Sequence, residues 1–281
     1  MEIFYEITPL KKKLAALKSQ NKKIGFVATM GALHAGHISL VETSNRENDV
    51  TVVSIFVNPT QFNNKEDLEK YPRNTEADVR LLEENECDIA FIPTVSEMYP
   101  TEDTRIFELG SVAEVMEGKY RPGHFNGVCQ IVSKLLDIIN PDNAYFGQKD
   151  YQQIAVVRAM VKKYMPKFKG NIVSCPIKRE TDGLALSSRN SHLNDEQRQS
   201  AVLISKTLFK VKEMSDKGAT QKEITDFVKK NIATDANLCL EYVEIADKDT
   251  LLPINGDLPV NAVVCVTVYD GSTRLIDNIL L

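Results

Sequence analysis

The chain has 281 residues, of which 43% are hydrophobic, so it can form one large domain or two ordinary ones and bury a substantial core. Lys and Arg total 34 against 39 Asp and Glu, a net charge of -5, and neither sign forms a long block, which disfavours a nucleic-acid partner. Five cysteines without a C-x-x-C pair disfavour a disulfide framework and a zinc site. The N-terminus lacks the basic lead and apolar stretch of a signal peptide, and no apolar run reaches the roughly 18 residues of a membrane span, so we expect a cytoplasmic protein with no membrane partner.

Short β-rich runs alternate with longer helical patterns over residues 1–180. The strands that we predict cover 23–30, 50–57, 88–92, 144–146 and 172–177. The predicted helices cover 37–47, 65–85, 127–139 and 151–164, after a first helix that carries Lys11, Lys12 and Lys13 on its solvated face. This alternation is typical of βαβ units. The sequence therefore predicts an α/β fold with a doubly wound, Rossmann-like parallel sheet.

The order of predicted helices and strands changes after Asn190. Two polar amphipathic helices are predicted over 195–217 and 221–232, followed by strands over 240–245, 262–269 and 273–278. This order favours a smaller C-terminal α+β domain. We place the boundary between Ile177 and Asn190 and expect two domains, 1–178 and 179–281. A short join would let them close on a ligand between them.

A glycine-bearing turn links the first predicted strand to the first helix of the sheet. In an open parallel sheet such a turn binds phosphate, because unpaired N–H groups and the helix dipole face the ligand. Gly31 and Gly36 have the spacing of a P-loop. The next residues are His37 and Ile38, however, where a P-loop needs Lys and then Ser or Thr, so a P-loop is excluded.

His34 and His37 lie three residues apart at the predicted helix start, on one face, where both can donate a hydrogen bond to phosphate. Such bonds strengthen as charge accumulates on the oxygens of a reacting phosphorus. The segment from His34 to His37 is similar to the H-x-G-H signature of the nucleotidylyltransferase superfamily. The similarity indicates chemistry at the α-phosphate of a nucleotide.

Asn58 and Gln61 follow the second predicted strand of the sheet, at the edge where ligands of doubly wound sheets bind. Their neutral amides suit an acid that carries hydroxyl groups. The same N-P-x-Q-F stretch is also compatible with a simple capped turn.

A third polar stretch, 145–153, again follows a predicted strand and opens a helix. Lys149 there can neutralise triphosphate charge, and Asp150 can cap the helix or orient a neighbour. The alternative for Lys149 alone is a solvated lysine. Gln153 lies four residues beyond Lys149, on the same side of the helix, where it can meet Gln61 across a substrate.

Two hydroxyls and a guanidinium, those of Ser187, Ser188 and Arg189, lie at the predicted domain boundary. Because arginine binds phosphate oxygens in a bidentate manner, these groups fit a clamp for leaving pyrophosphate. A helix-capping Ser-Ser pair with a surface arginine is the alternative.

The chain resembles the pantothenate synthetase family in six stretches, which in chain order are TMGALHAGH, FVNPTQF, YPRN, RPGHFNGV, YFGQKDYQQ and DGLALSSRN. These stretches extend to residue 190. The resemblance implies an AMP-forming ligase that condenses pantoate with β-alanine through a pantoyl-adenylate. It also implies magnesium, a homodimer and a C-terminal domain that covers the nucleotide.

Site residues follow from the resemblance by position. It implies that His37 is the general acid and that His34 assists at phosphate. We add Lys149 as a third catalytic residue, because its charge can stabilise the charge that develops on the phosphate. The resemblance implies that pantoate is held by Gln61 and Gln153, with Gln61 also close to β-alanine. We keep Asn58 as a third substrate-binding residue on the strength of its amide and its position after the strand. The resemblance implies ATP contacts from Thr29, Met30, Gly31, Ala32, Leu33, His34, Ala35, Gly36, His37, Gly147, Gln148, Lys149, Asp150, Lys178, Leu186, Ser187, Ser188 and Arg189.

The chain departs from the family pattern at two positions. Leu186 stands where many members have Met, a volume-conserving change. Lys178 stands where a small aliphatic residue is expected near adenine. We assign no metal ligand; Asp78 is a candidate for magnesium, with a helix-surface acid as the alternative.

Two other functions are compatible with parts of the pattern. One is a nucleotidylyltransferase that moves AMP onto a phosphate ester and stops there. The other is a non-catalytic nucleotide-binding protein, which the retention of both histidines, Lys149 and Arg189 disfavours.

Overall fold

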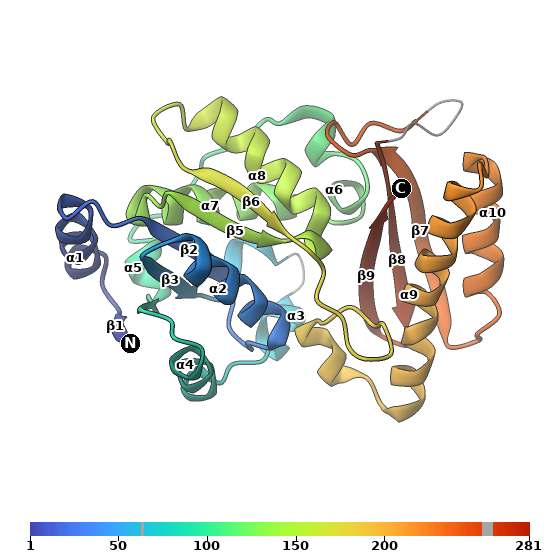
Figure 1. Ribbon diagram of the computed structural model, residues 1–281, viewed down its shortest axis with the longest axis horizontal. Helices are drawn as coiled ribbons and strands as arrows, with labels where there is room; N and C mark the ends of the chain where they lie inside the picture. Colours follow the sequence, from blue (N-terminus) through green and yellow to red (C-terminus); the bar gives the residue numbers. More distant parts are fainter. Residues whose placement is uncertain (63–64, 255–260) are drawn as a thin grey trace.

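The structure, a computed structural model, describes residues 1–62, 65–254 and 261–281. Its larger sheet has six parallel strands in the order β1-β4-β3-β2-β5-β6, and its smaller sheet has three antiparallel strands in the order β7-β8-β9 (Figure 1). The parallel strands are β1 (Glu2–Phe4), β2 (Ile24–Thr29), β3 (Val50–Ile55), β4 (Ile89–Phe91), β5 (Asn143–Gly147) and β6 (Asn171–Cys175). The antiparallel strands are β7 (Leu238–Asp247), β8 (Ala262–Asp270) and β9 (Thr273–Leu280).

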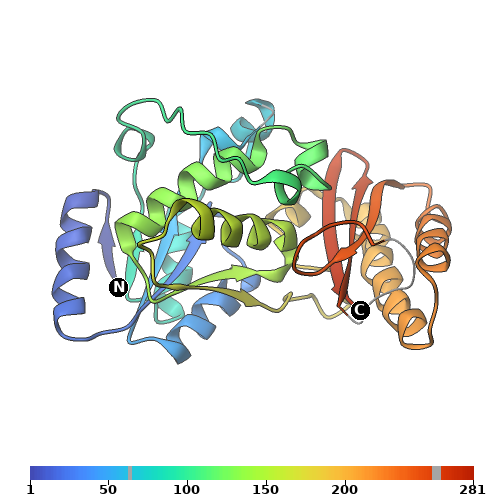
Figure 2. The ribbon, with the colours of Figure 1, turned by 90° about the horizontal axis from the view of Figure 1, so that it is seen from above.

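Helices connect the parallel strands and cover both faces of their sheet (Figure 2). They are α1 (Ile7–Ser19), α2 (Ala35–Glu47), α3 (Lys65–Lys70), α4 (Thr75–Glu84), α5 (Val95–Met98), α6 (Glu117–Tyr120), α7 (His124–Ile139) and α8 (Tyr151–Tyr164). Single 3-10 turns are η1 (Pro59–Gln61), η2 (Gly110–Ala113), η3 (Gln148–Asp150) and η4 (Ser188–His192). No helix in the described part of the chain is both long and apolar enough to cross a membrane.

The central strands are apolar on both faces, as expected for a parallel sheet with helices on both sides. Because side chains alternate along a strand, Phe26 and Val52 enter one core with α1, α7 and α8. Val27 and Val53 enter a second core with α2 and α4. The predicted doubly wound, Rossmann-like sheet is confirmed.

Parallel register brings the carboxyl ends of the central strands to one edge. Ile24 pairs with Val50 at one end of β2 and β3, and Thr29 pairs with Ile55 at the other. Strand β5 lies on the other side of β2 and ends at Gly147. The turns that follow β2, β3 and β5 therefore meet at the edge where ligands bind in this class of fold.

The C-terminal region is an α+β unit, as predicted. Helices α9 (Asp195–Asp216) and α10 (Gln221–Ile232) pack on one face of the three-stranded sheet and share an apolar core with it. The other face packs on the first region, where Tyr242, Val263 and Cys265 form a small cluster with Met116. The division at 178/179 stays a proposal; the parallel sheet ends at Cys175, before that position.

One local prediction was wrong, and one strand was missed. The single helix predicted over 65–85 is two helices, α3 and α4, because Pro72 between them has no N–H to donate and its ring blocks a continuous helix. Asn74 then caps α4 by accepting a hydrogen bond from the Ala77 N–H (3.1 Å). The short edge strand β1, which pairs with β4, was not predicted at all.

Candidate active site

A cavity of about 240 Å³ lies where β2, β3 and β5 end, and the loop before α9 closes one side of it. Most of the residues that the sequence nominated line this cavity. They are Thr29, Met30, His34, Gly36, His37, Asn58, Gln61, Gly147, Lys149, Asp150, Gln153, Lys178, Leu186, Ser187, Ser188 and Arg189. The other nominated residues do not line it, namely Gly31, Ala32, Leu33, Ala35 and Gln148.

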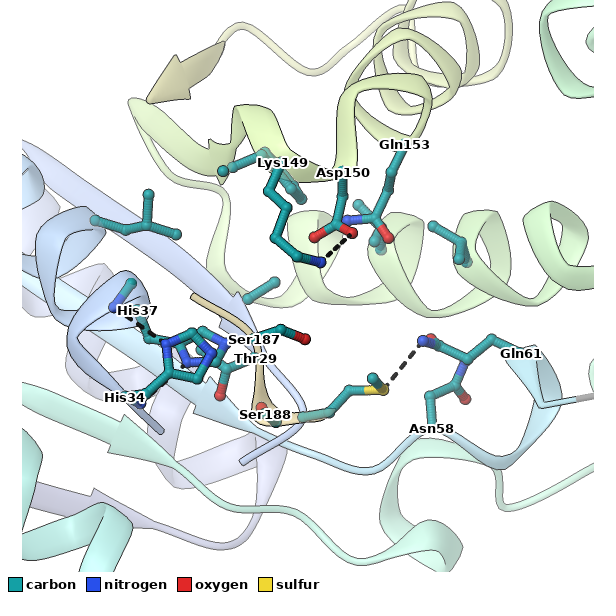
Figure 3. Close-up of a pocket in the computed structure, with 18 of the residues that line it drawn as sticks. Thr29, His34, His37, Asn58, Gln61, Lys149, Asp150, Gln153, Ser187 and Ser188 are labelled. Atoms are coloured by element: carbon teal, nitrogen blue, oxygen red, sulfur yellow. Dashed lines mark hydrogen bonds and ion pairs between the residues drawn. The ribbon is translucent and has the colours of Figure 1, made fainter. Parts of the chain in front are cut away.

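The two imidazoles face the cavity from the first turn of α2 (Figure 3). His34 is the N-cap, and its Nδ1 accepts a hydrogen bond from the Gly36 N–H at 3.1 Å. A side chain at Gly36 would disturb this arrangement, because a Cβ there would lie 2.8 Å from the ring of His34. The Nδ1 of His37 accepts from the His34 N–H at 3.3 Å. Since Nδ1 is the acceptor in both rings, we infer that the proton of each neutral imidazole is on Nε2, as a donor.

Burial keeps both histidines uncharged. It lowers the pKa of His34 to about 4, and the neighbouring Lys149 acts in the same direction. It lowers the pKa of His37 to about 3, and the neighbouring His34 and Lys149 act in the same direction. The ring centroids are only 4.1 Å apart, so two imidazolium ions here would repel each other strongly. At neutral pH the pair therefore offers two hydrogen-bond donors without a net charge.

A buried carboxylate holds the turn that presents these histidines. Gly31 and Ala32 both have positive φ, 80° and 49°, which exposes consecutive backbone N–H groups on one side. Asp78 of α4 accepts from the Ala32 N–H (3.0 Å) and the Leu33 N–H (2.7 Å). Because Asp78 is only 4% exposed, its interpretation as a helix-surface acid is wrong. Its two oxygens are occupied by the turn.

Lys149 and Asp150 reach into the cavity from η3, on the side opposite the histidines (Figure 3). The Lys149 Nζ lies 3.7 Å from an Asp150 carboxylate oxygen, and the lysine side chain is 18% exposed. A largely buried lysine whose nearest partner is a half-exposed acid is not the solvated lysine of the alternative interpretation. Its charge is available to an anionic ligand.

Gln61 and Gln153 face the cavity from different walls, Gln61 from η1 and Gln153 from the first turn of α8 (Figure 3). The Gln61 Nε2 lies 3.0 Å from the sulfur of Met30, a weak acceptor, so this amide keeps its capacity to bind a stronger one. The predicted meeting of the two glutamines across a substrate stays a prediction.

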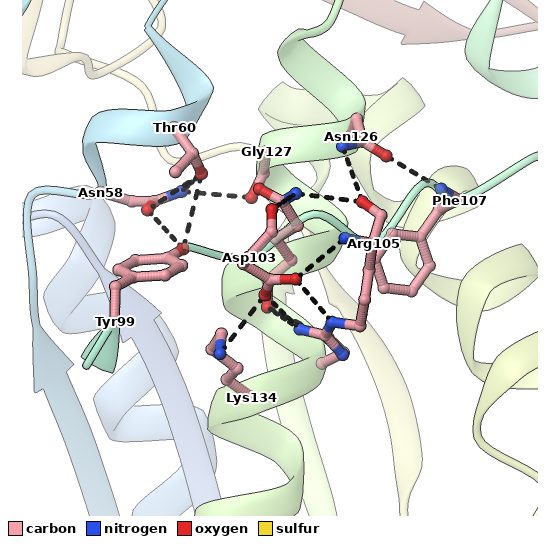
Figure 4. Close-up of polar contacts among 11 residues, drawn as sticks. Asn58, Thr60, Tyr99, Asp103, Arg105, Phe107, Asn126, Gly127 and Lys134 are labelled. Carbon is pink, nitrogen blue, oxygen red and sulfur yellow. Dashed lines mark hydrogen bonds and ion pairs between the residues drawn. The ribbon is translucent and has the colours of Figure 1, made fainter. Parts of the chain in front are cut away.

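Asn58 is buried, with an exposed fraction of 1%, and its amide is occupied by protein groups (Figure 4). Its Nδ2 donates to Gln61 Oε1 and to the Gly127 carbonyl, both at 3.1 Å. Its Oδ1 accepts from the Tyr99 hydroxyl at 2.8 Å. In this geometry Asn58 orients Gln61, and its predicted direct contact with substrate stays a prediction.

The loop 186–189 closes the cavity over the turn after β2. Ser188 Oγ donates to the Ala32 carbonyl (3.2 Å), and Ser187 Oγ caps η4 by accepting from the Arg189 N–H (3.3 Å). The Leu186 N–H donates to the Lys178 carbonyl (3.0 Å), so that carbonyl already has a partner.

A family model described as pantoate-beta-alanine ligase matches residues 2–280. The chain belongs to this family. A pantothenate synthetase of Bacteroides fragilis is 53% identical over 280 residues, with 99% of this chain and 98% of that protein covered. One from Porphyromonas gingivalis is 51% identical, with 99% of each covered.

Solved structures of the family have the same fold. The pantothenate synthetase of Thermus thermophilus superposes with a TM-score of 0.93 at 39% identity, and 99% of each chain is covered. The pantoate-beta-alanine ligase of Francisella tularensis, complexed with beta-gamma ATP and beta-alanine, superposes with a TM-score of 0.82 at 36% identity, covering 100% of this chain and 97% of that one.

The cavity is also lined by Tyr71, Arg121 and His124 of this chain, and sequence reasoning gave none of these three a role. His124 Nδ1 lies 2.9 Å from the Gln61 carbonyl, and its Nε2 lies 3.1 Å from Arg121 Nη1. Burial lowers the pKa of His124 to about 4, with Arg121 acting in the same direction. The available signal was their place in YPRN and RPGHFNGV, two of the six family stretches.

Proposed function

We propose that this chain condenses pantoate with β-alanine at the expense of ATP, giving pantothenate, AMP and pyrophosphate through a pantoyl-adenylate. It is thus a ligase that forms a carbon–nitrogen bond. The observation that carries the proposal is the pair of neutral imidazoles that faces Lys149 across a cavity at the carboxyl edge of the parallel sheet. Donors and a cation placed around one point suit the charge that develops during attack on an α-phosphorus.

In the first step, a pantoate carboxylate oxygen attacks the α-phosphorus of ATP, and the bond from that phosphorus to pyrophosphate breaks. The Nε2–H groups of His34 and His37 and the ammonium of Lys149 stabilise the charge on the phosphate oxygens. The N-terminus of α2, which carries both histidines, adds its dipole to the same region.

The general-acid role implied for His37 requires a protonated ring. Its pKa of about 3 keeps the free enzyme's ring neutral. A bound triphosphate raises that pKa because it is an anion close to the ring. We therefore assign His37 hydrogen-bond donation first and proton transfer only within the ATP complex.

In the second step, the amine of β-alanine attacks the carbonyl carbon of the adenylate, the new C–N bond forms and AMP leaves. Gln61 and Gln153 hold pantoate through their amides, with Gln61 also next to β-alanine. An acyl-adenylate hydrolyses in water, so the C-terminal unit would protect it by covering the nucleotide. The ATP contacts proposed above for the turn after β2, for 147–150 and for 178 and 186–189 complete the site.

Magnesium is proposed as the partner of ATP, where it would neutralise charge on the phosphates. Mg²⁺ in such sites takes one or two carboxylates together with phosphate oxygens. The described residues contain no group of three or more His, Cys, Asp or Glu that could hold the ion alone. Asp150 fits the smaller requirement, because it lines the cavity beside Lys149 and its carboxylate is half-exposed.

Two further proposals concern the state of the protein. A homodimer is proposed on the family resemblance. A cytoplasmic location is proposed because all five cysteines are free, which fits a reducing compartment. Neither proposal bears on the chemistry.

A pyrophosphate-exchange assay tests the function. With ATP and pantoate the protein should exchange label between pyrophosphate and ATP, and adding β-alanine should release AMP. A nucleotidylyltransferase would ignore β-alanine and release no AMP, and a non-catalytic binding protein would exchange nothing. Exchange without pantoate would overturn the substrate assignment and leave the adenylate chemistry in place.

A further inference from the structure

The last strand of the chain, β9, contacts both loops that close the nucleotide side of the cavity. It lies against η3, which carries Lys149, and against η4, which carries Arg189. The sequence shows no distinctive motif in this region. Two adjacent residues of β9, Asp277 and Asn278, make the polar contacts, and they are 4% and 2% exposed.

Both polar atoms of the Asn278 side chain form hydrogen bonds with the loop after β5. Its Nδ2 donates to the carbonyls of Gln148 (2.9 Å) and Lys149 (3.0 Å). Its Oδ1 accepts from Gln148 Nε2 at 3.3 Å. The turn η3 has Gly147 at its N-cap, which carries no side chain to cap it. The backbone from which the flexible Lys149 side chain extends is therefore fixed from β9.

Asp277 holds the second loop through one residue. Its carboxylate binds Arg179 in a bidentate pair, at 2.6 and 2.9 Å. Arg179 also donates to the Gly183 carbonyl at 3.2 Å, inside the tight hairpin that is closed by a bridge between Arg179 and Ala185. That hairpin leads directly into the loop 186–189. A buried bidentate pair fixes both the distance and the orientation of its partners.

We propose that Asp277 and Asn278 are positioning residues for the nucleotide site, holding the Lys149 loop and the 186–189 loop in one relative placement. The C-terminal sheet is then part of the site's framework as well as its cover. The proposal rests on the proposed role of Lys149 at the triphosphate. It predicts that replacing Asn278 lowers the affinity for ATP by displacing Lys149.

The variant Asn278→Asp tests this directly, since it keeps the shape of the side chain and sets a carboxylate oxygen against two carbonyls. We expect the Kd for a non-hydrolysable ATP analogue, measured by calorimetry, to rise about tenfold, because two buried hydrogen bonds are lost. Asn278→Ala removes the same hydrogen bonds and introduces no charge, so it replaces the Asp variant in the test if that variant does not fold. The matched control is Asn231→Asp, a half-buried asparagine of α10 that donates to Thr207 Oγ1 (2.7 Å), whose Kd should be unchanged.

A double-mutant cycle with Lys149→Ala separates positioning from general damage. If Asn278 acts through Lys149, its replacement should change the Kd less than twofold once Lys149 is absent. An equal rise in both backgrounds, or no rise in either, overturns the proposal. If Lys149→Ala alone leaves the Kd unchanged, the proposed role of Lys149 fails instead, which is a distinct result.

Discussion

Replacing Asp78 with Asn tests whether a residue that does not line the cavity controls the catalytic turn. The carboxylate accepts two backbone N–H groups, from Ala32 and Leu33, at 3.0 and 2.7 Å. An amide can accept only one of these bonds, and its NH₂ group would oppose the second N–H. The substitution changes no volume and leaves both histidines in place.

The expected cost follows from these two bonds. A hydrogen bond to a charged group contributes about 1.5–3 kcal/mol, and a buried donor left without a partner costs about 1–3 kcal/mol. We expect Asp78→Asn to lower the free energy of unfolding by about 3 kcal/mol. If half of that free energy is lost from the placement of the turn in the folded enzyme, the barrier to adenylation rises by about 1.4 kcal/mol. Adenylation then slows about tenfold.

Urea unfolding and pantoate-dependent pyrophosphate exchange measure the two effects. The matched control is Asp226→Asn on α10, whose carboxylate is 57% exposed and forms a surface pair with Lys222. That variant should unfold at the same urea concentration as the parent protein and keep full exchange activity, because an exposed ion pair contributes little to stability. If Asp78→Asn behaves like the control in both assays, Asp78 does not hold the turn.

Two further predictions concern single side chains. His37→Ala should slow adenylation by about 10²–10³-fold, the effect of removing one charge-stabilising donor, while thermal unfolding shifts far less; near-normal turnover contradicts the role assigned to His37. Asp270→Asn should stabilise the protein at pH 8, because Asp270 is fully buried, its carboxylate oxygens have no hydrogen-bond partner in the structure, and burial raises its pKa to about 6. A raised carboxyl pKa means that the wild type loses stability as pH rises from about 4 through 6. The gain should therefore be about 3 kcal/mol at pH 8 and much smaller at pH 4 in urea titrations. An equal gain at both pH values excludes ionisation as the cause.

Most of the fold and the centre of the site could be predicted from short stretches of sequence. A buried strand, a turn with Gly31 and Gly36 and a helix with two histidines in its first turn lie within fourteen positions, 24–37, so spacing alone placed His34 and His37 together. The same holds for Gly147 to Gln153, which forms the end of β5, one 3-10 turn and the start of α8. In both stretches, neighbours in sequence are neighbours in the site.

The residues that support these stretches come from distant parts of the chain, and no spacing rule reaches them. Asp78 is 45 residues from Leu33, and Asn278 is 129 residues from Lys149. Each is an ordinary polar residue at a regular position of a helix or strand, where the local pattern predicts a solvated side chain. Only the packing of α4 and β9 against the loops turns them inward. The break between α3 and α4 is a different case. Pro72 is itself a local signal for the end of a helix, but the helical pattern on both sides of it predicted one continuous helix.

The electrostatic state of the site follows from its burial. Lys149 is the cation that faces the histidines, and both rings are neutral partly because this cation is close. A charged imidazole would compete with Lys149 for the same anion and would repel it before the anion arrived. Neutral donors avoid this conflict, because they add hydrogen bonds to the phosphate oxygens at no cost in the empty site. When the triphosphate binds, it reverses the sign of the local field, and protonation of His37 then becomes favourable at the stage where pyrophosphate needs to leave.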